Sequence, residues 1–252
     1  MGKAAFLLHG WLSDHDDFKA LIPHLQGRYE RIELVSYPGH GPGDDYRNFK
    51  ARETVAHVER EYRRVLEECG EADVIGFSMG GALAAYLAAN YPVHKLVLLA
   101  PGNKYFNLKL PFSKVKFLLK TVYAYQRAVL AKDRESKKEL RQKLRGVFQD
   151  DIAGLRVIRD KWLRSYIRSA FRNFKELVAY VNERIECIDC PCFFAWGKLD
   201  QLVPRESIDF LAGLCVNERK VVKVYDHLSH FLLHSPEREE LVRDILDFLN
   251  EK

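Results

Sequence analysis

Short apolar runs alternate with longer segments of helical pattern along most of the chain, and this alternation strongly constrains the fold. The runs are rich in Val, Leu, Phe and Ala, which is typical of strands buried on both faces of a parallel sheet. Between and after them, residues 52–69 and 237–249 place apolar side chains at helical spacing. The pattern predicts an α/β fold with a doubly wound, mostly parallel sheet of about six strands. The six runs are residues 3–10, 31–37, 72–77, 95–101, 192–197 and 219–225.

The alternation is interrupted once, between residues 103 and 185. This segment contains helical patterns and no convincing strand. It holds 21 Lys and Arg against 8 Asp and Glu, a net charge of +13, whereas the remainder of the chain carries −8. An insertion at this point can fold over the carboxyl ends of the strands, where open α/β sheets bind ligands. We therefore predict a core of residues 1–102 and 186–252 with a basic helical cap, residues 103–185.

One strand-to-helix junction, VIGFSMGGALAAYLA at residues 74–88, crowds glycines around a single serine. One interpretation is that Ser78 is an ordinary helix N-cap among loop glycines. The other is the G-x-S-x-G nucleophile elbow, in which a strained turn lifts the serine hydroxyl above the sheet edge. In such a turn, a side chain at Gly76 or Gly80 would collide with neighbouring backbone. The apolar strand before Ser78 and the Ala-rich and Leu-rich helix after it favour the elbow.

A nucleophilic serine needs a base, and the base needs a group that orients it. In a nucleophile-elbow fold the chain order is serine, then an acid after a later strand, then a histidine after the last strand. Asp200 follows the run FFAWG and fits the acid; the alternatives are a cap for a helix near Pro204 or an ordinary loop position. His230 fits the base, but His227 lies nearer the strand end and His234 nearer the last helix, so spacing alone does not separate them.

Five motifs, LLHGW, YPGHG, GFSMGG, WGKLDQLVP and HLSHF, follow one another over almost the whole chain. Together they resemble the α/β-hydrolase superfamily. The size and position of the cap are similar to those of its bacterial carboxylesterase and monoacylglycerol-lipase branch. In that family the catalytic histidine is followed by an aromatic or aliphatic residue and is usually preceded by glycine. The resemblance selects His230, which Phe231 follows, although Ser229 stands where glycine is usual; His227 is the fallback.

The oxygen of an attacked ester carbonyl becomes negative and needs donors placed in advance, commonly two backbone N–H groups. Met79 follows the proposed nucleophile at a helix N-terminus, where the helix dipole also favours an anion. The resemblance implies that the second N–H comes from Trp11, with His9 and Gly10 shaping its loop. We expect His40, in the YPGHG motif, to support a loop and not to act as a second base.

The residues and the resemblance together predict a serine carboxylesterase, which hydrolyses carboxylic esters through a Ser-His-Asp triad and an acyl-enzyme. Aromatic residues in the cap favour esters of short to medium acyl chain, including monoacylglycerols. This mechanism needs no metal and no organic cofactor. In one alternative the same triad serves a thioesterase, a carbon–carbon bond hydrolase or a lyase of the menaquinone pathway, for which the basic cap suits an anionic substrate. The other alternative is a noncatalytic ligand-binding scaffold.

The cysteines and the apolar runs predict where the protein works. Five scattered cysteines do not indicate a disulfide framework, and the absence of a signal-like or membrane-spanning run predicts a cytoplasmic protein. Cys187, Cys190 and Cys192 have partly zinc-like spacing, but we expect them to be structural because no second pair completes a metal site. The expected partner is a small-molecule ester, with weak association to anionic membrane surfaces through the basic cap. We expect no nucleic-acid binding and no obligate protein partner.

Overall fold

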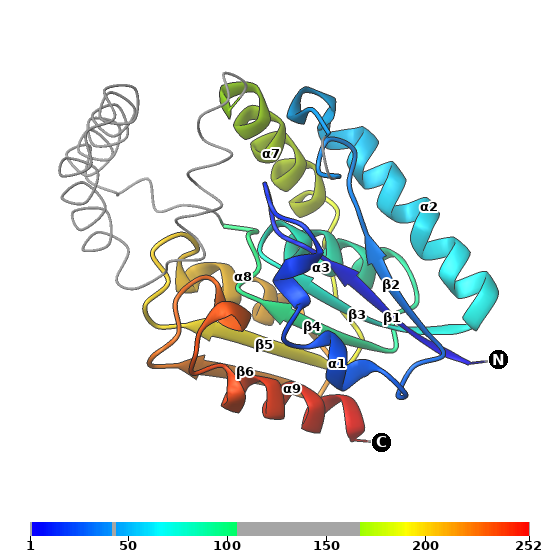
Figure 1. Cartoon of the computed structure of the whole chain (residues 1–252), viewed down its shortest axis with the longest axis vertical. Coiled ribbons are helices and arrows are strands. Elements are labelled where there is room, and N and C mark those ends of the chain that lie inside the picture. Colours follow the sequence, from blue (N-terminus) through cyan, green and yellow to red (C-terminus); the bar gives the residue numbers. More distant parts are fainter. Residues whose placement is uncertain (1, 42–43, 105–166, 252) are drawn as a thin grey trace, which may run out of the picture.

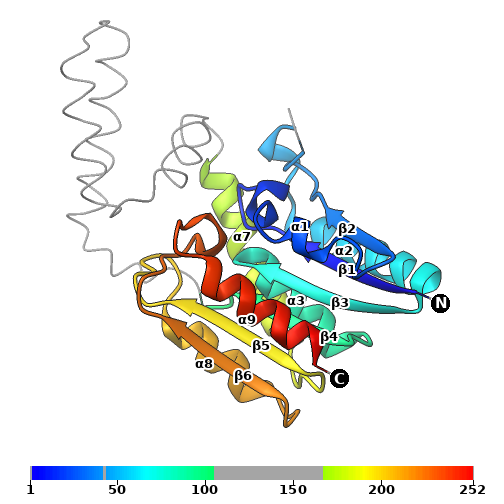
Figure 2. The ribbon, with the colours of Figure 1, turned by 60° about the horizontal axis from the view of Figure 1, so that its bottom comes forward.

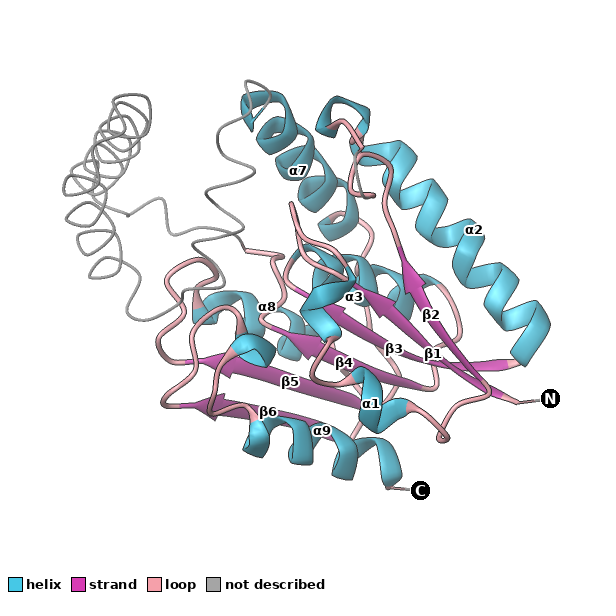
Figure 3. Cartoon of the chain, viewed as in Figure 1, coloured by secondary structure: helices cyan, strands magenta, loops and turns pink. Residues whose placement is uncertain are grey.

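Six parallel strands form a single sheet in the computed structural model, which describes residues 2–41, 44–104 and 167–251 (Figures 1 and 3). The strand order is β2-β1-β3-β4-β5-β6, and every neighbouring pair is parallel. The predicted fold class is therefore confirmed. The strands are β1 (Lys3–Leu8), β2 (Arg31–Val35), β3 (Glu71–Phe77), β4 (Lys95–Leu99), β5 (Cys192–Gly197) and β6 (Lys220–Tyr225).

Strand side chains alternate between two separate hydrophobic cores, one on each face of the sheet. In register across β1, β3 and β4, Phe6, Val74 and Leu96 belong to one core. The next register position, with Leu7 and Ile75 among its members, belongs to the other core. Because β1, β3, β4 and β5 are buried on both faces, these strands read as continuous apolar runs instead of alternating polar and apolar residues. The edge strands β2 and β6 are more exposed and include charged residues.

Helices cover both faces of the sheet, as the doubly wound prediction requires. Figure 2 shows α9 in front of the sheet with α3 and α8 behind it. One face packs against α2 (Ala51–Cys69), α3 (Met79–Asn90), α7 (Ile167–Asn182) and α8 (Arg205–Leu214). The other face packs against α1 (Ile22–Leu25) and α9 (Glu239–Asn250). Three short 3-10 helices complete the described elements: η1 (His15–Phe18), η2 (Tyr46–Asn48) and η3 (Leu232–His234).

Helix α7 lies within the predicted cap but packs as part of the core. Its buried side chains Phe174, Leu177 and Val178 join the core that also contains α2 and α3. The apolar stripe of α7 faces the other core helices. Residues 105–166 lie outside the described part of the chain, so the cap predicted for residues 103–185 stays a prediction.

The two ends of the insertion are joined by a pair of asparagines. The Asn103 side-chain amide donates to Oδ1 of Asn182 at 2.7 Å, and the Asn182 amide donates to the Asn103 carbonyl at 2.8 Å. The chain therefore leaves the sheet after β4 and returns through α7 at the same place.

Within the described ranges, no helix is both long and apolar enough to cross a bilayer.

Candidate active site

Ser78 occupies the turn between β3 and α3 with a backbone conformation that L-residues rarely adopt. Its φ is +53° and its ψ is −115°, and such strain in a non-glycine residue persists only where the surrounding structure enforces it. The neighbouring strand supplies that enforcement: the Ser78 N–H donates to the Leu99 carbonyl at 2.9 Å, and the Ser78 carbonyl accepts from the Gly102 N–H at 2.8 Å. The Ser78 hydroxyl makes no capping hydrogen bond to α3. The ordinary N-cap interpretation is therefore wrong, and the geometry is that of the elbow.

The predicted elbow glycines stand where α3 touches the sheet most closely. A Cβ atom at Gly76 would lie 2.4 Å from the Gly80 carbonyl oxygen. A Cβ atom at Gly80 would lie 1.9 Å from the carbonyl oxygen of Leu8 in β1. Neither contact is sterically possible, so only glycine lets α3 approach β1 and β3 at this distance.

The structure brings Ser78, His230 and Asp200 together in one chain of hydrogen bonds. His230 Nε2 lies 3.0 Å from Ser78 Oγ, and His230 Nδ1 lies 2.8 Å from Asp200 Oδ2. The Asp200 side chain is fully buried, and that of His230 is 7% exposed. The His230 ring packs against Phe77 and Phe231, with ring centroids 5.1 and 5.4 Å away. These contacts hold the imidazole between the serine and the carboxylate.

Asp200 is fixed by its own loop. Its Oδ1 accepts the backbone N–H groups of Leu202 and Val203, both at 2.8 Å, while Oδ2 faces His230. It does not cap α8, which begins at Arg205 with Pro204 at the N-cap position. The carboxylate therefore turns the loop after β5 and orients the imidazole at the same time.

The two competing histidines are placed elsewhere. His227 is exposed on the loop after β6. His234 ends η3, and its Nε2 lies 3.4 Å from Oδ1 of Asp17. Of the three histidines after β6, His230 is the one hydrogen-bonded to Ser78.

The loop after β1 uses three of its backbone N–H groups in hydrogen bonds within the protein. The Gly10 N–H donates to Asp17 Oδ2, the Leu12 N–H to His40 Nε2, and the Ser13 N–H to the Gly10 carbonyl. Within the described part of the chain, the Trp11 N–H has no acceptor. Met79 is the first residue of α3, so its N–H also lacks a partner inside the helix. The predicted oxyanion donors are therefore two N–H groups that the surrounding backbone leaves available, and their role stays a prediction.

His9 fixes the direction of the Trp11 N–H through the intervening peptide. Its Nδ1 donates to the Gly10 carbonyl at 2.9 Å, and a planar trans peptide points the following N–H the opposite way. Burial lowers the pKa of His9 to about 4, although the nearby carboxylates of Asp17 and Asp14 act in the opposite direction. At neutral pH His9 is uncharged, and because a carbonyl only accepts, its proton is on Nδ1. His40 supports the same loop by accepting the Leu12 N–H, as expected.

The Trp11 indole packs against α7. Its ring centroid lies 5.2 Å from that of Phe174 and 5.8 Å from that of Phe171. The loop that carries the proposed oxyanion donor thus contacts the helix through which the chain returns from the insertion.

The sequence does not single out Asp17, which accepts the Gly10 N–H of this loop. The segment SDHDDF contains three acidic residues and no pattern that separates them.

The cysteines lie away from the triad. Cys190 and Cys192 are buried, and the Cys192 thiol donates to the Cys190 carbonyl at 3.1 Å, whereas Cys187 is exposed. Among the residues that the structure describes, no three His, Cys, Asp or Glu side chains are arranged to hold a metal ion.

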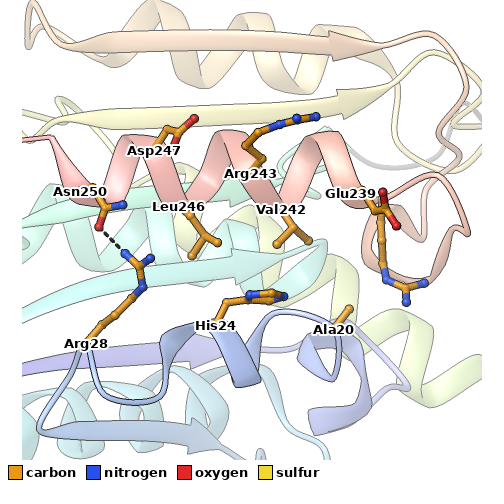
Figure 4. Close-up of a pocket in the computed structure, with 10 residues that line it drawn as sticks. Ala20, His24, Arg28, Glu239, Val242, Arg243, Leu246, Asp247 and Asn250 are labelled. Atoms are coloured by element: carbon orange, nitrogen blue, oxygen red, sulfur yellow. Dashed lines mark hydrogen bonds between the residues drawn. The ribbon is translucent and has the colours of Figure 1, made fainter.

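A surface groove of about 530 Å³ runs between α1 and α9 (Figure 4). His24 and Arg28 line it from the α1 side, and Val242, Arg243 and Leu246 line it from α9. At one end, Arg28 donates to the Asn250 side chain. The groove contains none of the predicted catalytic residues, which all follow the carboxyl ends of strands.

The fold and the site together define a class of protein. A serine on a strained strand-to-helix turn, joined through a histidine to a buried carboxylate above a doubly wound parallel sheet, is the arrangement of α/β-hydrolase proteins. A sequence model of the alpha/beta hydrolase family matches residues 5–243, so the chain belongs to that family. The predicted family is therefore confirmed.

Several relatives are similar over nearly their whole length. A carboxylesterase of Bacillus subtilis is 21% identical over 250 residues, covering 98% of this chain and 92% of the relative. A pimeloyl-[acyl-carrier protein] methyl ester esterase of Aeromonas hydrophila is 26% identical over 252 residues, covering 96% of this chain and 94% of the relative. The structure of a monoacylglycerol lipase from Paleococcus ferrophilus superposes with a TM-score of 0.62 at 19% identity, covering 98% of this chain and 93% of that one. These names agree with the predicted branch of the family.

Replacing Gly80 with alanine tests the close approach of α3 to β1. We expect Gly80→Ala to destabilise the protein by about 3 kcal/mol or more, because its Cβ would overlap the Leu8 carbonyl. Thermal unfolding followed by circular dichroism measures the effect. The matched control is Gly213→Ala in α8, where a Cβ meets no atom within 4 Å and helix propensity favours alanine by up to about 1 kcal/mol. Equal melting temperatures for the two variants would contradict this account.

The buried neutral His9 predicts a loss of stability in mild acid. The unfolded chain takes up a proton at His9 near pH 6.5, whereas the folded protein does so only near pH 4. Stability from this residue is therefore complete above pH 6.5 and falls as the pH is lowered to 4, by about 3 kcal/mol in all. Urea unfolding of wild type and His9→Asn at pH 7, 5.5 and 4.5 isolates this contribution as the difference between the two proteins. The same pH dependence in both would disprove it.

Proposed function

We propose that this protein is a serine carboxylesterase that hydrolyses carboxylic esters of short to medium acyl chain, monoacylglycerols among them. The observation that carries the proposal is the unbroken chain of hydrogen bonds from Ser78 Oγ through His230 to Asp200, at 3.0 and 2.8 Å. It starts at a serine whose backbone is strained, and strain of this kind clusters at functional sites. The names of the carboxylesterase and methyl ester esterase relatives support esters as the substrate class.

In the proposed first half-reaction, Ser78 Oγ attacks the ester carbonyl carbon while His230 Nε2 takes its proton. The carbonyl oxygen becomes an oxyanion that accepts the Met79 and Trp11 N–H groups. The imidazolium then gives its proton to the leaving alcohol as the carbon–oxygen bond breaks, which leaves an acyl ester on Ser78. Asp200 stabilises the imidazolium without taking its proton, and its two backbone donors keep it oriented.

The second half-reaction repeats these steps with water as the nucleophile. His230 accepts a proton from the water, whose oxygen bonds to the acyl carbon and gives a second oxyanion on the same donors. Collapse of this intermediate releases the carboxylic acid and returns the proton to Ser78 Oγ. The proposed mechanism uses no metal and no organic cofactor. The proposed partner is the small-molecule ester, with weak association to anionic membrane surfaces through the predicted basic cap.

The charge of the insertion favours a second candidate, in which the same triad acts on an anionic substrate. Residues 103–185 carry a net charge of +13, and a basic surface raises the local concentration of anions. A thioester, a carboxylated substrate with a carbon–carbon bond to cleave, or a methyl ester on a carrier protein, as in the name of the Aeromonas relative, belongs to this class. Turnover that falls steeply between about 50 and 300 mM salt would favour it over neutral esters.

Steady-state hydrolysis of p-nitrophenyl esters, from acetate to palmitate, tests the leading proposal. We expect kcat/KM to peak at short or medium chains and kcat to fall by about 10⁴-fold or more in both Ser78→Ala and His230→Ala. The matched control is His227→Ala, which removes an exposed imidazole three residues before His230 and should retain full activity. Loss of activity in His227→Ala with retention in His230→Ala would assign the base to His227 instead.

A folded wild-type protein that hydrolyses none of these esters would favour the second candidate. Acyl-CoA thioesters and carboxylated diketones would then be assayed with the same variants. Equal activity of wild type and Ser78→Ala on any substrate would contradict both candidates.

A further inference from the structure

Asp17 is a buried carboxylate that no step of the mechanism uses. It lies beside residues 10–13, which we call the oxyanion loop because they include the proposed donor Trp11. It lies in η1, and its side chain is 2% exposed. Its Oδ2 accepts the Gly10 N–H at 2.9 Å, and its Oδ1 accepts the Ser13 hydroxyl at 2.7 Å. Burying a carboxylate destabilises the folded protein unless hydrogen-bond donors surround it. The Asp17 carboxylate therefore requires these donors to stay in place.

The two donors come from the two ends of one tight loop. Gly10 and Ser13 flank Trp11 and Leu12, and the Ser13 N–H closes the turn on the Gly10 carbonyl at 3.3 Å. A carboxylate can only accept, so the Gly10 N–H and the Ser13 O–H must both point at Asp17. With both ends held, the Trp11 N–H in the middle has little freedom to change direction.

A third contact joins Asp17 to the segment that carries His230. His234 Nε2 lies 3.4 Å from Asp17 Oδ1 across 217 residues of sequence. His234 follows His230 by four residues and ends η3. Two hydrogen bonds stabilise this short segment: the Leu232 N–H donates to the His230 carbonyl and the His234 N–H to the Phe231 carbonyl, both at 2.9 Å. One carboxylate therefore connects the loop after β1 with the turn directly after the proposed base.

We propose that Asp17 is a positioning residue, which holds the oxyanion loop at a fixed position relative to His230. The inference rests on the proposed function, because it concerns where the oxyanion donor sits relative to the serine and the base. Oxyanion donors act on charge that develops only in the transition state. Loosening them therefore lowers kcat and leaves substrate binding, and with it KM, nearly unchanged.

The test combines ester kinetics with labelling of Ser78 by a fluorophosphonate, which needs the activated serine but no knowledge of the natural substrate. We expect Asp17→Ala to lower kcat and the labelling rate constant 10-fold to 100-fold, with KM within 3-fold of wild type. Asp17→Asn keeps the size and one acceptor and should recover part of this loss. Single-contact variants, Ser13→Ala and His234→Ala, should each lower the labelling rate 2-fold to 5-fold.

The matched control is Asp73→Asn, at the opposite end of β3. Asp73 is also a buried carboxylate with three partners: Tyr29 Oη at 2.5 Å, His94 Nδ1 at 2.6 Å and Lys3 Nζ at 2.8 Å. Its substitution should lower the melting temperature while the labelling rate at 25 °C stays within 2-fold of wild type. This control separates a general loss of stability from a loss of positioning.

Wild-type kcat and labelling in Asp17→Ala, or an equal loss in Asp73→Asn, would overturn the inference while the proposed function stands. If Asp17→Ala does not fold, the single-contact variants decide: unchanged labelling in both Ser13→Ala and His234→Ala overturns the inference. Absence of labelling in folded wild type, or equal labelling in Ser78→Ala, would instead contradict the proposed function and remove the basis of this inference with it.

Discussion

The close packing of α3 on the sheet is the constraint on which the rest of the site depends. From Met79 to Leu87 every residue of α3 is buried, with β1, β3 and β4 on one side and α2 and α7 on the other. A helix with no solvent-exposed face gains its stability from this burial and not from amphipathic patterning. Because Gly76 and Gly80 let the backbones touch, the turn before α3 has no room to relax, and Ser78 is held at positive φ.

The parallel sheet converts this local constraint into a site. Parallel strands present their carboxyl ends at one edge, so the loops after β1, β3, β5 and β6 meet there although they are far apart in sequence. β1 and β3 are neighbours, which places the loop of Trp11 beside the turn of Ser78. Asp200 and His230 follow the neighbouring strands β5 and β6, which lets the carboxylate reach the imidazole. Had any of these strands been antiparallel, its loop would lie at the other end of the sheet.

The sequence predicts those features whose cause is local. The six strands follow from apolar runs, and Ser78 and Asp200 follow from motifs in a fixed chain order. His230 is separated from His227 and His234 only by the family resemblance. Strand ends are less predictable: the run at 95–101 continues beyond β4, which stops at Leu99 because Ala100 adopts a φ of +44° before Pro101. The packing of α7 and the contact between Asp17 and His234 depend on segments far apart in the chain, so no local pattern reveals them.

The electrostatics of the site depend on groups that the fold holds in place. Asp17 and Asp200 are both buried, and each has backbone N–H groups among its donors, so their hydrogen bonds are part of the fold itself. His9 is held neutral by burial and turned toward the Gly10 carbonyl. In the proposed reaction, charge then appears only on the substrate oxygen and on His230, while the groups around them keep their hydrogen bonds. Such preorganised surroundings stabilise a transition state because they need not rearrange when the charge develops.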